Sequence, residues 1–122
     1  MRTALLLIAH GSRVEDANED LRDLARRLRA ASHYSVVESS YLELAEPNID
    51  GGAERCVRQG AKRIIMLPYF LSAGVHVRRD LEAAQRRLQD LHSGVEIRLA
   101  DAIGQHPKIV EIVLDRAREM EN

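Results

Sequence analysis

The sequence predicts an α/β fold of three layers, in which a four-stranded parallel sheet carries helices on both faces. Apolar runs and helical patterns alternate four times along the chain, and this βαβαβαβα order is typical of a parallel sheet. The 122 residues fit a single domain, residues 1–122. A hydrophobic content of 45% and a charged content of 30% indicate a globular chain that can bury one core.

The first strand and the first helix carry the clearest patterns. Residues Thr3–Ala9 form a continuous apolar run, as expected of a strand covered on both faces. Ser12 stands three residues before Glu15, the spacing of a capping box, and predicts that a helix begins there. The apolar residues of that helix fall on one face and are expected to point inward: Ala17, Leu21, Leu24, Leu28 and Ala31.

The second strand is predicted at Ser35–Leu42, and its weaker apolar character favours an edge position. Pro47 suits the first position of a second helix, which ends near Gly60. The residues that this helix is expected to bury are Ile49, Ala53, Cys56 and Val57.

The third strand is predicted at Lys62–Tyr69, followed by a loop at Phe70–Val75. A third helix then carries Val77, Leu81, Ala84, Leu88 and Leu91 on one face, and the fourth strand covers Val95–Ala100. A loop at Asp101–His106 leads to a last helix that begins at Pro107. Its inward residues are predicted as Ile109, Ile112, Val113, Ala117 and Met120.

Right-handed crossovers between these strands favour the order 2-1-3-4, a flavodoxin-like sheet. Ligands of such sheets bind beyond the carboxyl ends of the strands, near the point where the strand order reverses. His10, Glu43, His76 and Asp101 each follow a different strand and are therefore expected at this rim. His10 and His76 follow the two strands that flank the reversal point.

Two imidazoles at such a rim suit two kinds of chemistry. Neutral imidazole binds divalent cobalt, iron, nickel, copper or zinc, and it accepts a proton near neutral pH. Glu43 is placed to complete a metal site or to orient a histidine, and a solvated surface role is the simpler alternative for this residue. Hydrogen-bonded structural roles are the corresponding alternatives for His10 and His76.

An anion is the second ligand that the rim favours. Ser12 and Gly11 form a turn before a helix, where backbone N–H groups attract negative charge. Arg13, Arg78 and Arg79 lie beside the two histidines, where a ligand with several carboxylates requires positive charge, and a solvated surface role is the simpler alternative for these arginines. The fuller glycine spacing of a nucleotide-binding motif is absent from this turn, so no nucleotide is expected.

Composition excludes several classes of protein. Eighteen basic and 19 acidic residues give a net charge of -1, which argues against a nucleic-acid or membrane-surface partner. Cys56 is the only cysteine, so one chain has no disulfide framework and no cysteine-based zinc site, as fits the cytoplasm. The longest apolar run, Ala4–Ala9, is far shorter than the roughly 20 residues that span a bilayer.

Four stretches together resemble the small CbiX-type, or SirB-like, class II chelatases, a family that includes sirohydrochlorin cobaltochelatases and ferrochelatases. The stretches cover nearly the whole chain in the order of the family, and they read LLLIAHGSR at 5–13, YLELAEP at 41–47, MLPYFLSAGVHVRRD at 66–80 and IGQHP at 103–107. His-Gly-Ser alone is unspecific, but its combination with the Gly-x-His-Val stretch is a strong signal. One departure is Asp80-Leu81-Glu82, where many relatives have Asp-Ile-Pro.

The resemblance implies a chelatase fold and a lyase that inserts a divalent metal into a tetrapyrrole without ATP. It assigns His10 and His76 as metal ligands or proton acceptors, and Glu43 as an assisting group. It further implies sirohydrochlorin, which carries peripheral carboxylates, as substrate, in cobalamin or siroheme biosynthesis. Because the chain has a single domain, it resembles the short form of the family, which assembles as a homodimer.

Cobalt is the expected metal substrate, with iron and nickel as alternatives, because two histidines do not select among these ions. One alternative function is a metal or tetrapyrrole carrier without turnover. Another is a phosphoryl-transfer enzyme with His10 as nucleophile, although arginines do not surround this histidine closely. A third is a degenerate subunit of a larger chelatase.

Overall fold

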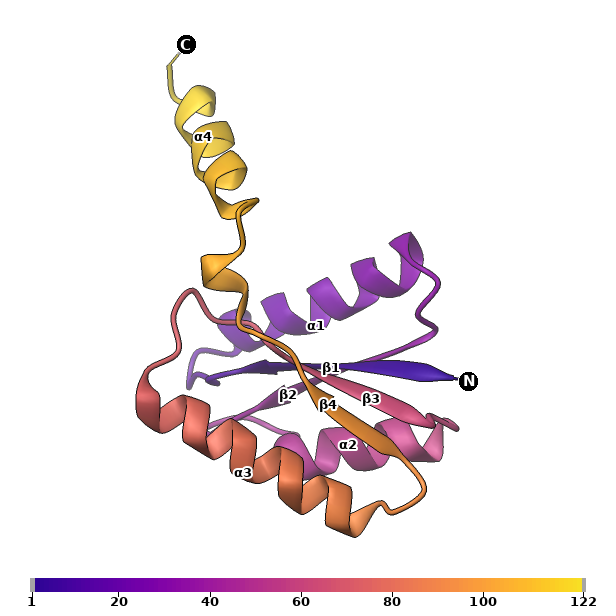
Figure 1. The fold of residues 1–122 in the computed structure, drawn as a ribbon. Coiled ribbons are helices and arrows are strands. Elements are labelled where there is room, and N and C mark those ends of the chain that lie inside the picture. The colour runs from indigo at the N-terminus through magenta and orange to yellow at the C-terminus, as the bar shows by residue number, and fades with distance from the viewer. Residues whose placement is uncertain (1, 122) are drawn as a thin grey trace.

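The computed structural model describes residues 2–121 and confirms the predicted sheet. Its four strands are parallel and stand in the order β2-β1-β3-β4. Helices and strands alternate along the chain, with one short 3₁₀ helix after the last strand (Figure 1). The elements are β1 (Thr3–Ala9), α1 (Glu15–Ala31), β2 (Val36–Tyr41), α2 (Ile49–Arg58), β3 (Arg63–Pro68), α3 (Val75–Leu91), β4 (Glu96–Leu99), η1 (Ile103–Gln105) and α4 (Ile109–Glu119).

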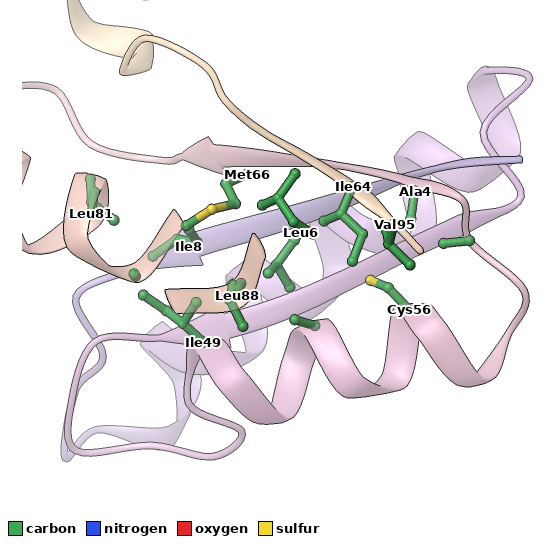
Figure 2. Close-up of a cluster of buried hydrophobic side chains, with 14 of the residues drawn as sticks. Ala4, Leu6, Ile8, Ile49, Cys56, Ile64, Met66, Leu81, Leu88 and Val95 are labelled. Carbon is green, nitrogen blue, oxygen red and sulfur yellow. The ribbon is translucent and has the colours of Figure 1, made fainter. Parts of the chain in front are cut away.

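Helices lie on both faces of the sheet, with α1 on one face and α2 and α3 on the other (Figure 1). Alternate residues of β1 point into two separate cores, because side chains of a strand alternate between its faces. Leu6 and Ile8 pack with Ile64 and Met66 on the α2 and α3 side (Figure 2). Leu5 and Leu7 pack on the α1 side, where the cluster also contains Leu21, Ala25, Val37 and Tyr41.

The first helix begins two residues later than the capping-box spacing predicts. Val14 is the N-cap of α1, and no side chain caps it. The Ser12 hydroxyl instead accepts the Val14 N–H at 3.0 Å, which closes a turn before the helix. The predicted inward face is also partly wrong: Ala17 and Ala31 are exposed, and the buried residues are Asn18, Leu21 and Ala25.

The second and last helices also begin two residues after the predicted prolines. Asn48 caps α2, and its Oδ1 accepts the Gly51 N–H at 2.8 Å, so Pro47 lies outside the helix. Lys108 precedes α4 in the same way, and its N–H binds His106 Nδ1 at 3.1 Å. In both places a polar side chain next to the proline satisfies the free N–H groups.

The largest error concerns α4, whose apolar residues do not face the core. Helix α4 leaves the sheet and extends away from it on the side of α1 (Figure 1). No residue of α4 is buried, and Val113 is 61% exposed. Periodicity predicts which side chains share a face, but it does not predict which surface covers that face.

None of the helices in residues 2–121 combines the length and the apolar character that crossing a lipid bilayer requires.

Candidate functional site

The predicted site residues follow the carboxyl ends of parallel strands. His10 comes directly after β1, Glu43 follows β2, His76 follows β3 and Asp101 follows β4. The registers of the three strand pairs align these ends along one edge of the sheet. The sequence therefore predicted the correct edge for all four side chains.

His10 is exposed, but neighbouring segments hold it in place. Its imidazole packs on the ring of Phe70, with 4.4 Å between the ring centroids and 32° between the planes. Phe70 itself is buried, so it forms a fixed support for the imidazole. The carbonyl oxygen of His10 accepts the Glu43 N–H at 3.0 Å, which joins the segments after β1 and β2.

Gly11 allows this close approach of the two segments. Its φ of +93° lies in the left-handed region, where a side chain is strained. A Cβ atom at this position would lie 1.8 Å from the carbonyl oxygen of Glu43. Only glycine fits here, so the turn after His10 depends on this residue.

Asn18 holds the turn on its other side, and the sequence analysis missed it. Its Oδ1 accepts the Ser12 N–H at 2.9 Å, and its Nδ2 donates to the Ser12 carbonyl oxygen at 2.8 Å. The buried Tyr41 hydroxyl donates to the carbonyl oxygen of Asn18 at 2.6 Å. Asn18 stands three residues before Leu21, on the buried face of α1, and a polar residue on that face was the available signal.

The contact with Asn18 changes one expectation about anion binding. The Ser12 N–H is committed to a buried side chain, so this amide is not free for a ligand. Ser12 can still offer a ligand its hydroxyl, which accepts the Val14 N–H. The next residue, Arg13, can offer its guanidinium group. The predicted anion site at this turn therefore rests on Arg13 rather than on the Ser12 amide.

We expect Asn18→Ala to loosen the turn that carries His10. The substitution leaves the N–H and the carbonyl oxygen of the half-buried Ser12 without their partner. An unsatisfied group costs about 1–3 kcal/mol of unfolding free energy when fully buried, so we expect a loss near the lower end of this range. Urea denaturation measures this loss, with Asp20→Ala as a control at an exposed position of the same helix. Equal stability of the two variants would show that Asn18 does not hold the turn.

His76 lies in the first turn of α3 rather than in the loop before it. It is the second residue of the helix, after the N-cap Gly74, and it is exposed. Within residues 2–121, no hydrogen bond or ring contact joins His76 to His10 or Glu43. The same residues contain no group of three or more His, Cys, Asp or Glu side chains arranged to hold a metal ion.

A hollow of about 640 Å³ lies beside the end of β3. The segment after β3, the start of α3 and the segment after β4 form its walls, and Pro68, Leu71, Arg78 and Asp101 are among its lining residues. Gly104 joins two of these walls, because its N–H donates to the Phe70 carbonyl oxygen at 3.0 Å. Of the predicted anion-binding residues, only Arg78 lines the hollow.

Positive charge at this edge of the sheet is free to bind a ligand. Arg22, Arg26, Arg63 and Arg87 form ion pairs with carboxylates, whereas the described residues provide no such partner for Arg13 or Arg78. Both guanidinium groups are exposed. An unpaired arginine loses no existing ion pair when it binds a ligand carboxylate.

Cys56 takes no part in this edge of the sheet. Its side chain is buried among the residues on the α2 and α3 side, as the sequence predicted. Burial raises the pKa of its thiol to about 12, so the reactive thiolate is scarce at neutral pH.

Comparison with known proteins assigns the chain to a family. The sequence model of CbiX matches residues 4–120, a span that includes His10, Glu43 and His76. The chain belongs to the CbiX family. The resemblance read from the four stretches of sequence is therefore confirmed.

Two CbiX-family relatives differ greatly in length. The chain is 39% identical to a sirohydrochlorin cobaltochelatase of Priestia megaterium, over 96% of this chain but only 38% of the relative. It is 32% identical to a sirohydrochlorin cobaltochelatase of Methanocaldococcus jannaschii, over 93% of this chain and 96% of the relative. The CbiX chain thus spans less than half of one relative and nearly all of the other.

Solved structures confirm the fold of this CbiX chain. A CbiX protein of Marinobacter aquaeolei VT8, described as a putative cobalamin biosynthesis protein, superposes with a TM-score of 0.82 and 35% identity, over 96% of this chain and 95% of that one. The sirohydrochlorin chelatase SirB of Bacillus subtilis subspecies spizizenii, in complex with cobalt, gives a TM-score of 0.87 and 32% identity. That match covers 98% of this chain and 51% of SirB.

Proposed function

We propose that this chain inserts a divalent metal, with Co²⁺ as the first candidate, into sirohydrochlorin without ATP. The observation that carries the proposal is the match to a relative named sirohydrochlorin cobaltochelatase, which extends over nearly the whole of both chains. Other relatives are named sirohydrochlorin ferrochelatase, among them proteins of Arabidopsis thaliana and Bacillus subtilis. Iron therefore remains the second metal substrate, and nickel the third.

His10 and His76 bind the metal ion and take up protons in this proposal. Insertion of a divalent cation releases two pyrrole N–H protons from the macrocycle, so charge balances when two bases accept them. Imidazole serves both as a ligand and as a base near neutral pH. Two protein ligands leave coordination positions open for the pyrrole nitrogens, as a metal in transit requires. Glu43, bonded through its backbone to His10, assists with a carboxylate.

Arginines hold the edge of the macrocycle. The peripheral carboxylates of sirohydrochlorin match the unpaired guanidinium groups of Arg13 and Arg78, and the Ser12 hydroxyl lies in the same turn as Arg13. Arg78 lines the hollow beside β3, whose apolar walls include Pro68 and Leu71. The apolar walls suit the face of a flat ring, and Arg78 is placed to pair with a carboxylate at its periphery.

We expect Arg78→Ala to weaken binding of sirohydrochlorin about tenfold, because a charge-assisted hydrogen bond contributes about 1.5–3 kcal/mol and exposure reduces its effect. Titration of the metal-free protein, followed by absorbance, measures the dissociation constant. Arg86→Ala is the matched control, since Arg86 is exposed on the same helix but does not line the hollow. Binding of Arg78→Ala at the wild-type level would remove this arginine from the site.

A second copy of the chain completes the cleft. One domain, residues 1–122, supplies a single wall for a tetrapyrrole, and twofold dimers are the commonest oligomers. We therefore propose a homodimer. The single buried Cys56 fits a reducing compartment, which supports the cytoplasm as the place of the reaction.

The test is a direct insertion assay. Purified protein is mixed with sirohydrochlorin and Co²⁺, Fe²⁺ or Ni²⁺, and the absorbance of the metal-free macrocycle is followed against a protein-free control. The proposal predicts a rate well above the spontaneous one for at least one metal. Binding without acceleration indicates a carrier and contradicts the proposed enzyme. Inertness towards all three metals contradicts it as well, and leaves phosphoryl transfer at His10 as the next activity to assay.

A further inference from the structure

The segment between β3 and α3 carries the support of His10. Residues 69–74 form neither helix nor strand, and Phe70 lies at their start. The Phe70 side chain belongs to the buried cluster on the α2 and α3 side of the sheet, and its ring contacts the His10 imidazole. A shift of the backbone at Phe70 therefore moves the surface on which the imidazole lies.

Within residues 2–121, two backbone hydrogen bonds tie the start of this segment to other elements. The Tyr69 N–H donates to the Ile8 carbonyl oxygen at 2.7 Å, and the Phe70 carbonyl oxygen accepts the Gly104 N–H at 3.0 Å. The first bond continues the pairing of β1 with β3, whereas the second comes from η1, the short helix after β4 (Figure 1). Gly104 thus fixes the position of Phe70 from a segment outside the first three strands.

Gly104 fits against this segment because it has no side chain. A Cβ atom on Gly104 would lie 1.5 Å from the carbonyl oxygen of Leu71 and 2.2 Å from its carbonyl carbon. Both are backbone atoms, so rotation of a side chain does not relieve the clash. The φ of Gly104 is not in the left-handed region, so the close approach of two backbones requires glycine here, and not the backbone conformation.

Gly104 does not itself line the candidate site. Its neighbours Ala102 and Gln105 line the hollow beside β3, but Gly104 does not. It has no side chain to offer a metal ion or a carboxylate, and its N–H is already bonded to Phe70. An effect of Gly104 on a reaction at His10 is therefore expected to pass through Phe70.

We propose that Gly104 is a positioning residue for metal insertion, which fixes the His10 imidazole by holding the backbone of Phe70. The proposal deepens the proposed function and rests on it, because it takes His10 as a ligand of the metal ion. The His10 side chain is exposed and forms no hydrogen bond within the described residues, so the Phe70 ring is its main support. A displacement of about 1 Å at a reacting group costs up to about 10²-fold in rate, so a fixed support matters here.

The test compares Gly104→Ala with Phe70→Leu, which keeps an apolar side chain but removes the ring. We expect each variant to insert cobalt into sirohydrochlorin about 10–10²-fold more slowly than wild-type protein, since each releases the imidazole from its support. Rates are measured at a temperature at which circular dichroism shows that the variant is folded. Gly94→Ala is the matched control and keeps the wild-type rate, because no atom lies within 4 Å of a Cβ placed there.

The double variant tests whether Gly104 acts through Phe70. If it does, Gly104→Ala with Phe70→Leu is as slow as Phe70→Leu alone, because the ring that transmits the displacement is already absent. Losses that multiply in the double variant show two independent effects and overturn the proposal.

The NMR signals of the imidazoles in metal-free protein give a readout that a change of stability alone does not move. The Phe70 ring, centred 4.4 Å from the His10 ring, shifts the resonances of the His10 ring protons by an amount that depends on the orientation of the two rings. We expect this shift to vanish in Phe70→Leu and to change in Gly104→Ala, while the His92 signals keep their positions. Wild-type His10 signals or a wild-type insertion rate in folded Gly104→Ala overturns the proposal.

Hydrogen exchange of the wild-type protein replaces Gly104→Ala if that variant fails to fold. We then expect the Gly104 amide to be protected by its bond to Phe70, and Phe70→Leu to remain slow in insertion. A Gly104 amide that exchanges like an unprotected one, or a wild-type rate in Phe70→Leu, overturns the proposal.

Failure of this proposal is distinct from failure of the proposed function. Wild-type protein that inserts cobalt, together with an equally active Gly104→Ala variant, keeps the chelatase and rejects the positioning role. Wild-type protein that leaves the spontaneous insertion rate unchanged rejects the chelatase. The His10 signals of the metal-free variants then still decide whether Gly104 fixes the imidazole.

Discussion

Replacing His10 by alanine is expected to lower the rate of cobalt insertion by about 10²–10⁴-fold, the range for loss of a positioned base. The imidazole lies on the ring of Phe70 at the end of β1, so it is held in place before any ligand arrives. Alanine removes a metal ligand and a proton acceptor together. Initial rates of the absorbance change with sirohydrochlorin and Co²⁺ measure the effect.

His76→Ala is expected to cause a loss of the same order, because the proposed site has only two imidazoles. Both variants are expected to keep the wild-type free energy of unfolding, since both side chains are exposed. His33→Ala is the control, as this exposed histidine follows α1 and packs on Tyr34. Wild-type rates in His10→Ala and His76→Ala would remove these residues from the mechanism.

The second large effect is expected from Gly11→Ala, which disturbs the turn beside His10. The new Cβ would lie 1.8 Å from the Glu43 carbonyl oxygen, and the φ of +93° strains any side chain. Backbone strain of this kind costs about 1–3 kcal/mol, and the clash adds to it. We expect a lower free energy of unfolding in urea and a lower insertion rate, because relief of the clash moves His10 away from its position.

Gly94→Ala is the matched control for this prediction. No atom lies within 4 Å of a Cβ placed at Gly94, and its φ is not in the left-handed region. The control is expected to keep the stability and the rate of the wild-type protein. A Gly11→Ala variant that matches the control in both measurements would show that the turn tolerates a side chain.

The strands were predictable because burial on both faces leaves an unbroken apolar run. Thr3–Ala9 is such a run, and β1 occupies those residues with a neighbour on each side. The order of the strands then follows from the handedness of the crossovers. The sheet edge that gathers His10, Glu43 and His76 was predictable for the same reason.

Local hydrogen bonds explain the errors at the helix starts. Ser12 has the spacing of a helix cap, but its N–H and carbonyl oxygen bind Asn18 and its hydroxyl accepts from Val14. These contacts depend on where α1 packs, which a spacing rule does not include. Phe70 was predicted as the first residue of the loop after the third strand, and its contact with the His10 ring depends on the register of β1 and β3.

The position of α4 was not predictable from periodicity. The spacing of Ile109, Val113 and Ala117 correctly indicates a helix with one apolar face. It does not identify the surface that covers this face. The prediction of an inward α4 failed at this step, and the exposure of Val113 is the sign of it.

The most direct test of the two-histidine site is the response of the histidine side chains to one equivalent of Co²⁺. The chain has five histidines, and single substitutions assign their imidazole signals in the NMR spectrum of the metal-free protein. We predict that the signals of His10 and His76 shift and broaden together, while those of His33 and His92 keep their positions. A response of only one of the two, or of neither, would contradict a shared metal site.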